Sequence, residues 1–148
     1  MFKKIAVAAV ATTFSLSASM SYAGPKAEVL HWWTSGGEAK SVAVLQKEFS
    51  ENGGTWTDMP VAGGGGDAAM TALRARVLSG NAPAAVQLKG PSIQEWYEEG
   101  ALADISDVAN KNNWSKVLPE SIAGHMKCEG KWCAAPVNVH RIDWIWAV

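Results

Sequence analysis

The stretch Trp32-Trp33-Thr34-Ser35-Gly36-Gly37-Glu38 joins a short apolar segment to a helical one. We predict a strand over 27–33, a glycine turn, and a helix over 38–50 with apolar residues at helical spacing. Neighbouring strand residues point to opposite faces, so both tryptophans are core residues only if both faces of a sheet are covered. The preferred interpretation is a sugar site, because indole stacks on a pyranose ring and the Glu38 carboxylate accepts hydrogen bonds from hydroxyls.

The alternation of strands and helices continues along the chain. We predict a strand over 55–61, a glycine loop over 63–66, a helix over 67–79 capped by Asp67, an apolar strand over 84–88 and a short helix over 91–99. This β-α-β-α-β-α order predicts an α/β fold, with a parallel sheet flanked by helices.

The remainder of the chain carries a different pattern. A more helical stretch is expected over 105–126, followed by a turn at 129–130 and a long extended run over 132–148. The apolar end, Trp144 to Val148, has no turn, cap or polar tail, which predicts that the natural protein continues beyond it.

Three predicted strands end in loops that should lie on one edge of the sheet. In open parallel sheets, ligands bind beyond the carboxyl ends of the strands. The loops are 32–38, 63–67 and 89–92, and Lys89 follows the third strand directly. A lysine at that position either is solvated or contacts a ligand. The candidate binding residues are Trp32, Trp33, Glu38 and Lys89.

The first 23 residues are typical of a secretory signal peptide. A basic start is followed by an apolar run over 5–11 and by Ser21-Tyr22-Ala23, a small-x-small cleavage pattern. The run is too short for a transmembrane helix.

The first 23 residues hold two of the thirteen basic side chains and none of the fourteen acidic ones, so the mature chain has a net charge of about −3. This balance favours a soluble exported protein and argues against nucleic acid or an anionic membrane as partner. Arg74 and Arg76 are interpreted as a solvated helix pair.

Cys128 and Cys133 are separated by four residues. In an exported protein, a disulfide that closes a small hairpin is the leading interpretation. A metal site with His125 is the alternative, but no fourth ligand is placed nearby. A redox pair has two intervening residues rather than four. No metal and no cofactor are therefore predicted.

Other chemical sites are weakly supported. The pattern Gly63-x-Gly65-x-x-Ala68 formally matches a dinucleotide fingerprint, but it follows the second strand and no acidic residue lies about 20 positions on. A tight turn that brings backbone close to a ligand is the preferred reading. No nucleophile–base pair emerges, and Glu38 has no second carboxylate at a predictable distance. His31 is expected to be packed, and we assign Trp96, Trp114 and Trp132 to core or surface packing.

Taken together, the motifs resemble the extracellular solute-binding proteins of sugar ABC transporters, most closely the glucose/mannose-binding proteins of Gram-negative bacteria. The similarity covers essentially the whole mature chain. The segments that carry it are Val29-Leu30-His31-Trp32-Trp33-Thr34-Ser35-Gly36-Gly37-Glu38, Pro60-Val61-Ala62-Gly63-Gly64-Gly65-Gly66-Asp67, Gln87-Leu88-Lys89-Gly90 and Pro136-Val137-Asn138-Val139-His140-Arg141.

The resemblance implies a periplasmic-binding-protein-like fold of type II, in which two α/β lobes close around a monosaccharide. It implies that Trp32 and Trp33 stack on the sugar and that Glu38 and Lys89 bind hydroxyls, with a membrane permease as partner and no catalysis. Residues 24–136 would form the first lobe and 137–148 would begin the hinge strand. In that strand, Asp143 stands where the resemblance leads us to expect an asparagine-like hinge residue. An exported sugar-active enzyme and a nucleotide-binding oxidoreductase remain the alternatives.

Overall fold

The computed structural model describes residues 24–138, so the predictions for the signal peptide and for residues 139–148 lie outside it. The first part contains β1 (Lys26–His31), α1 (Gly36–Glu51), β2 (Thr55–Pro60), a 3-10 turn (Gly64–Gly66), α2 (Asp67–Leu78), β3 (Ala85–Val86) and α3 (Ser92–Glu98). The second part contains α4 (Ser106–Lys111), α5 (Trp114–Val117), α6 (Glu120–His125), β4 (Lys127–Cys128) and β5 (Lys131–Trp132).

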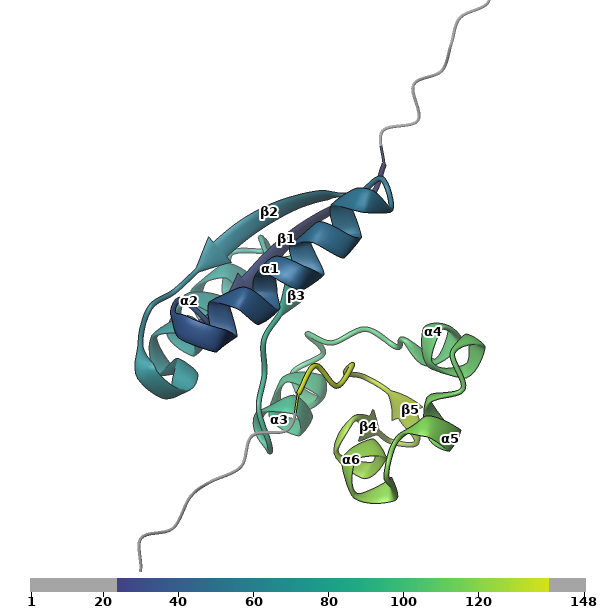
Figure 1. The fold of residues 1–148 in the computed structure, drawn as a ribbon. Helices are drawn as coiled ribbons and strands as arrows, with labels where there is room; N and C mark the ends of the chain where they lie inside the picture. The colour runs from purple at the N-terminus through teal and green to yellow at the C-terminus, as the bar shows by residue number, and fades with distance from the viewer. Residues whose placement is uncertain (1–23, 139–148) are drawn as a thin grey trace, which may run out of the picture.

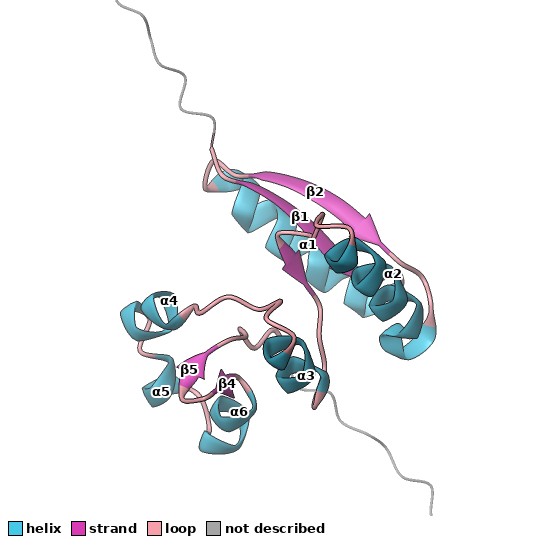
Figure 2. Ribbon diagram, turned by 180° about the vertical axis from the view of Figure 1, so that it is seen from behind, coloured by secondary structure: helices cyan, strands magenta, loops and turns pink. Residues whose placement is uncertain are grey.

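The first three strands form a parallel sheet in the order β2-β1-β3. The register runs from Lys26 opposite Thr55 to His31 opposite Pro60. Figures 1 and 2, seen from opposite sides, show α1 on one face of this sheet and α2 on the other. The predicted α/β fold with a parallel sheet flanked by helices is therefore confirmed.

The main core lies between the sheet and α2. Its buried residues are Leu30, Ala69, Leu73 and Trp96, with Met59 and Val86 packed against them. On the other face of the sheet, α1 contributes the buried residue Val42. Both faces of β1 are thus covered by helices, which is the condition under which both Trp32 and Trp33 can be core residues.

The strand ends differ from the sequence prediction. β1 ends at His31, two residues early, because the chain turns there and the Thr34 N–H donates to the Trp32 carbonyl at 3.0 Å. β3 comprises two residues rather than the five predicted over 84–88. Asp67 is the first residue of α2, and Gly66, with φ of 90°, occupies the N-cap position. A positive φ suits glycine and not aspartate, which explains the shift.

The predicted helical stretch over 105–126 is three short helices, because Asn113 has a positive φ and Pro119 precedes α6 in an extended conformation. β4 and β5 pair as an antiparallel hairpin. In both views these elements lie together, apart from the three-stranded sheet (Figures 1 and 2). Residues 133–138, which lie in the predicted extended run, follow β5 without belonging to a strand or a helix.

Two further interpretations can be judged. Trp96 and Trp132 are 3% exposed, as expected of core residues, and the half-buried Trp114 packs edge-on against Trp132 with ring centroids 5.4 Å apart. Arg76 of α2 is not a solvated residue, because its side chain is 17% exposed and forms a two-pronged ion pair with Glu28 of β1. Among residues 24–138, no helix combines the length and the apolar character needed to cross a bilayer.

Candidate functional site

A groove of about 1450 Å³ opens at the carboxyl ends of the parallel strands and continues beside α1 to residues 134–138. At the strand ends it is lined by Trp32, Trp33, Glu38, Gly65, Gln87 and Lys89, and we call this part the strand-end groove. All four candidate residues of the sequence analysis therefore line the same groove. They converge because parallel strands end at one edge of the sheet, so that their loops meet there.

Trp32 packs against the glycine loop. A Cβ placed on Gly66 would lie 2.9 Å from the indole ring, closer than a real side chain allows. The loop backbone therefore approaches the ring only because residue 66 is glycine. Trp32 is half-buried, so part of its indole belongs to the core while the residue still lines the groove.

Lys89 connects the third loop to the other two. Its Nζ lies 5.9 Å from the centroid of the Trp32 ring, within the range of a cation–π contact. The same Nζ donates a hydrogen bond to the carbonyl of Gly65. Lys89 is exposed, and these two contacts direct its ammonium group over the groove rather than away into solvent.

Trp33 and Glu38 occupy different environments. Trp33 is 4% exposed and lines both the strand-end groove and a smaller cavity of about 280 Å³ beneath α1. Glu38 is exposed in the first turn of α1, where the helix dipole favours a carboxylate. The core interpretation thus holds for most of Trp33, whereas Glu38 is an exposed residue that lines the groove.

A histidine–aspartate pair fixes the end of β1. His31 is 5% exposed, as predicted, and its Nε2 lies 2.9 Å from Asp58 Oδ1, which also accepts a hydrogen bond from Trp56 Nε1 at 3.0 Å. Burial raises the pKa of Asp58, but the hydrogen bonds from Trp56 and His31 outweigh burial and hold this pKa below its ordinary value. The backbone immediately before Trp32 is therefore anchored to β2.

Gln87 is a groove residue that the sequence analysis did not select. Its Oε1 accepts a hydrogen bond from the backbone N–H of Trp32 at 3.1 Å. An amide side chain between the apolar residues Val86 and Leu88, two positions before Lys89, was the available signal. That signal could not be used alone, because the sequence does not show that β3 leaves the sheet at this point.

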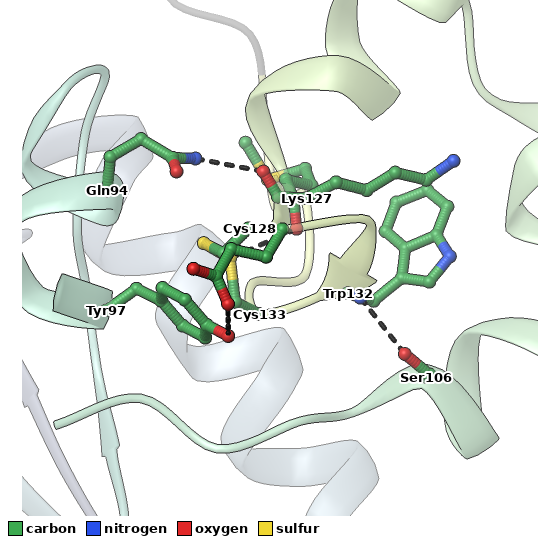
Figure 3. The surroundings of a disulfide bond; sticks show 9 residues. Gln94, Tyr97, Ser106, Lys127, Cys128, Trp132 and Cys133 are labelled. Atoms are coloured by element: carbon green, nitrogen blue, oxygen red, sulfur yellow. Dashed lines mark hydrogen bonds between the residues drawn. A yellow bond between two sulfur atoms is a disulfide. The ribbon is translucent and has the colours of Figure 1, made fainter. Parts of the chain in front are cut away.

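The disulfide packs against Leu88, just after β3, and Cys133 lines the part of the groove that runs toward residues 134–138. The structure contains the predicted bond between Cys128 and Cys133, packed against Ile93. Gln94 Nε2 donates to the Lys127 carbonyl at 3.0 Å, and the Tyr97 hydroxyl donates to Glu129 at 3.2 Å (Figure 3). Burial, and then the Glu129 carboxylate, raise the pKa of Tyr97. Within residues 24–138, no three histidine, cysteine, aspartate or glutamate side chains are grouped as metal ligands.

Curated proteins of high similarity were found, although no family model matches the chain. A probable sugar-binding periplasmic protein of Rhizobium meliloti is 50% identical over 144 residues, covering 97% of this chain and 35% of that protein. Proteins of the same description in Brucella melitensis and Mesorhizobium japonicum are 56% and 44% identical, over 80% and 99% of this chain and 28% and 35% of their own lengths. The chain thus spans about a third of the length of these relatives.

Among solved structures, the fold resembles an ABC substrate-binding protein of Listeria monocytogenes in complex with cycloalternan. The TM-score is 0.60 at 21% identity, and the match covers 74% of this chain and 28% of that one. At this identity the likeness concerns the fold alone. The curated relatives are named as binding proteins and not as enzymes. The sequence similarity shows that the chain belongs to the family of these probable sugar-binding periplasmic proteins.

Proposed function

We propose that this chain is part of the periplasmic sugar-binding component of an ABC importer, with an aldohexose such as glucose as its ligand. The observation that carries the proposal is the strand-end groove, where side chains from three β–α loops converge. Stacking surface, a carboxylate and an ammonium group on one groove are the groups that a neutral polyhydroxylated ring requires. The names of the curated relatives support the sugar class, and the choice of an aldohexose rests on the resemblance to glucose/mannose-binding proteins.

Each of the four residues has a distinct role in this proposal. Trp32 offers the more accessible indole, and the contribution of Trp33 is limited to the small part that is exposed. Glu38 accepts hydrogen bonds from sugar hydroxyls, while Lys89 donates to them from its position over the Trp32 ring. None of these roles breaks a covalent bond in the sugar, so the proposed function is binding and release.

The proposal also assigns a role to each part of the chain. Residues 1–23 direct export to the periplasm, 24–136 belong to the first lobe, and 137–148 begin the crossing to a second lobe. Closure of the two lobes buries the sugar, and the closed form is recognised by the membrane permease. One lobe supplies only part of the wall around the ligand, so tight binding requires both.

The first experiment measures hexose binding by calorimetry in protein expressed from the complete reading frame. The variant Glu38→Gln keeps the size of the side chain but replaces a charged acceptor with a neutral one. The expected loss is about fivefold in affinity, since hydrogen bonds to charged groups are stronger by about 1 kcal/mol. The matched control is Glu120→Gln, which makes the same change in the first turn of α6, outside the groove.

Unchanged affinity in folded Glu38→Gln protein would show that the groove is not the binding site. The same samples test the enzyme alternative, because a binding protein returns the sugar unaltered. Chromatography that detects new products after incubation with hexoses or oligosaccharides would contradict the proposed function and favour a sugar-active enzyme.

A further inference from the structure

Gln87 lies where β3 separates from β1. The last register pair is Leu30 with Val86, and the Gln87 N–H donates to the Leu30 carbonyl at 2.8 Å. In a parallel ladder, the next bond would run from the Trp32 N–H to the main-chain carbonyl of Gln87. Here the side-chain Oε1 of Gln87 accepts that N–H instead, at 3.1 Å. The side chain therefore takes the place of the main chain, and the backbone is free to turn toward Lys89.

This bond fixes the orientation of the Gln87 amide. A backbone N–H can only donate, so the atom that faces Trp32 is the oxygen and the opposite atom is the Nε2 donor. Gln87 is half-buried and lines the strand-end groove together with Trp32 and Lys89. Within the described part of the chain, no hydrogen bond is donated by Nε2. An oriented donor thus stands on the groove wall with its donating capacity unused.

We propose that Gln87 is a further ligand-binding residue, whose Nε2 donates a hydrogen bond to one hydroxyl oxygen of the bound sugar. This inference rests on the proposed function, because it concerns the same groove. Glu38 can only accept from a sugar and Lys89 can only donate to it. Gln87 differs because the Trp32 backbone holds its amide in one orientation, so its donor is preorganised and selects one hydroxyl position.

Two substitutions separate the roles of the amide. Gln87→Glu keeps an oxygen acceptor for the Trp32 N–H but removes the donor, whereas Gln87→Met removes both at similar length. The charge control is Gln46→Glu, at an exposed residue of α1 that lines the smaller cavity but not the strand-end groove. Protein from the complete reading frame is used throughout, with thermal unfolding measured without sugar and affinity measured by calorimetry.

We expect Gln87→Glu to unfold near the parent temperature and to bind its best hexose about two- to tenfold more weakly, the range for one neutral hydrogen bond. Gln87→Met should lose both thermal stability and affinity, and Gln46→Glu should lose neither. The inference is overturned if Gln87→Glu binds the hexose as tightly as the parent, or if its unfolding temperature is as low as that of Gln87→Met. In either case the role of Gln87 is structural only.

A panel of monodeoxy hexoses distinguishes a hydrogen bond from the added charge. If Nε2 donates to one hydroxyl, the sugar that lacks this hydroxyl should bind equally well to the parent and to Gln87→Glu. The other monodeoxy sugars should bind the parent more tightly, as a thermodynamic cycle requires. An equal loss on every sugar would indicate a general charge effect and would overturn the inference. If the parent protein binds no hexose, the proposed function and this inference both fall, whereas a parent that binds normally confines any failure to Gln87.

Discussion

The sheet unit (residues 26–86) and the hairpin region (residues 105–134) are built by different means. The helices of the sheet unit, α1 and α2, have 16 and 12 residues, whereas α4, α5 and α6 have 6, 4 and 6. Helices shorter than about 12 residues are not stable in isolation. The hairpin region therefore depends on tertiary contacts for its local structure, while the sheet unit carries its pattern in longer segments.

The buried side chains show the same contrast. The sheet unit buries Leu30 completely and Leu73 almost completely, and Trp96 of α3 joins them. The buried residues of the hairpin region are two alanines, Trp132 and the two disulfide-bonded cysteines. Buried apolar area is the main favourable term in folding. The buried side chains of the hairpin region are small apart from Trp132, and this region contains a covalent cross-link. One small chain thus combines a region stabilised mainly by apolar packing with a region that contains a covalent cross-link.

The most damaging change to the sheet unit should be Leu30→Ala. Leu30 is 0% exposed and lies at the centre of the main core, so its truncation leaves a cavity and costs about 3–5 kcal/mol of unfolding free energy. Hydrogen exchange followed by mass spectrometry should show faster exchange in β1 and β2. The control Leu78→Ala changes an 83% exposed leucine and should have little effect. Equal effects of the two substitutions would contradict the assignment of this core.

The hairpin region should respond to removal of its disulfide. The double variant Cys128→Ser/Cys133→Ser should cost about 2 kcal/mol, because the closed loop is short and its closure entropy is small. Exchange should accelerate in β4, β5 and α6 and remain slow in β1. If β1 loosened to the same extent, the two regions would form one cooperative unit and the contrast between them would be lost. Mass spectrometry of the exported parent protein checks the bond itself, by the absence of two free thiols.

The smallest effect concerns acid stability. The hydrogen bond from Arg76 lowers the pKa of Glu28, with N–O distances of 2.6 Å for both prongs of the pair. A carboxyl whose pKa is lower in the folded state stabilises the fold above its unfolded pKa, and that stabilisation is lost as pH falls through the folded value. Thermal stability should therefore fall between about pH 5 and pH 3, and Glu28→Gln should flatten this dependence.

A matched variant in the hairpin region shows whether this acid dependence differs between the two regions. In the hairpin region, hydrogen bonds from Ser106 lower the pKa of Asp104, whose Oδ2 lies 3.8 Å from Lys131 Nζ in an exposed pair. Asp104→Asn should flatten the acid dependence less than Glu28→Gln, because the exposed pair is better screened by solvent. A larger effect from Asp104→Asn in melting curves recorded across this pH range would reverse the expected order.

The sequence was sufficient to predict the features that depend on local periodicity. Alternating apolar strands and amphipathic helices specified the parallel sheet, and strand direction then required the loops that carry Trp32, Glu38 and Lys89 to share one edge. The disulfide between Cys128 and Cys133 was also predicted from the sequence, because pairing of two nearby cysteines is favoured in an exported protein. These inferences need only the covalent chain and the geometry of regular structure.

Features that depend on where segments meet were decided by the tertiary structure alone. The Arg76–Glu28 pair joins residues 48 positions apart, and the bond from Trp32 to Gln87 spans 55 positions. Likewise β3 is short because its backbone turns away after Val86, and no local pattern in its apolar sequence records that turn. Periodicity in a sequence specifies which face of an element is apolar, whereas partners across the fold are set by packing between elements that are distant along the chain.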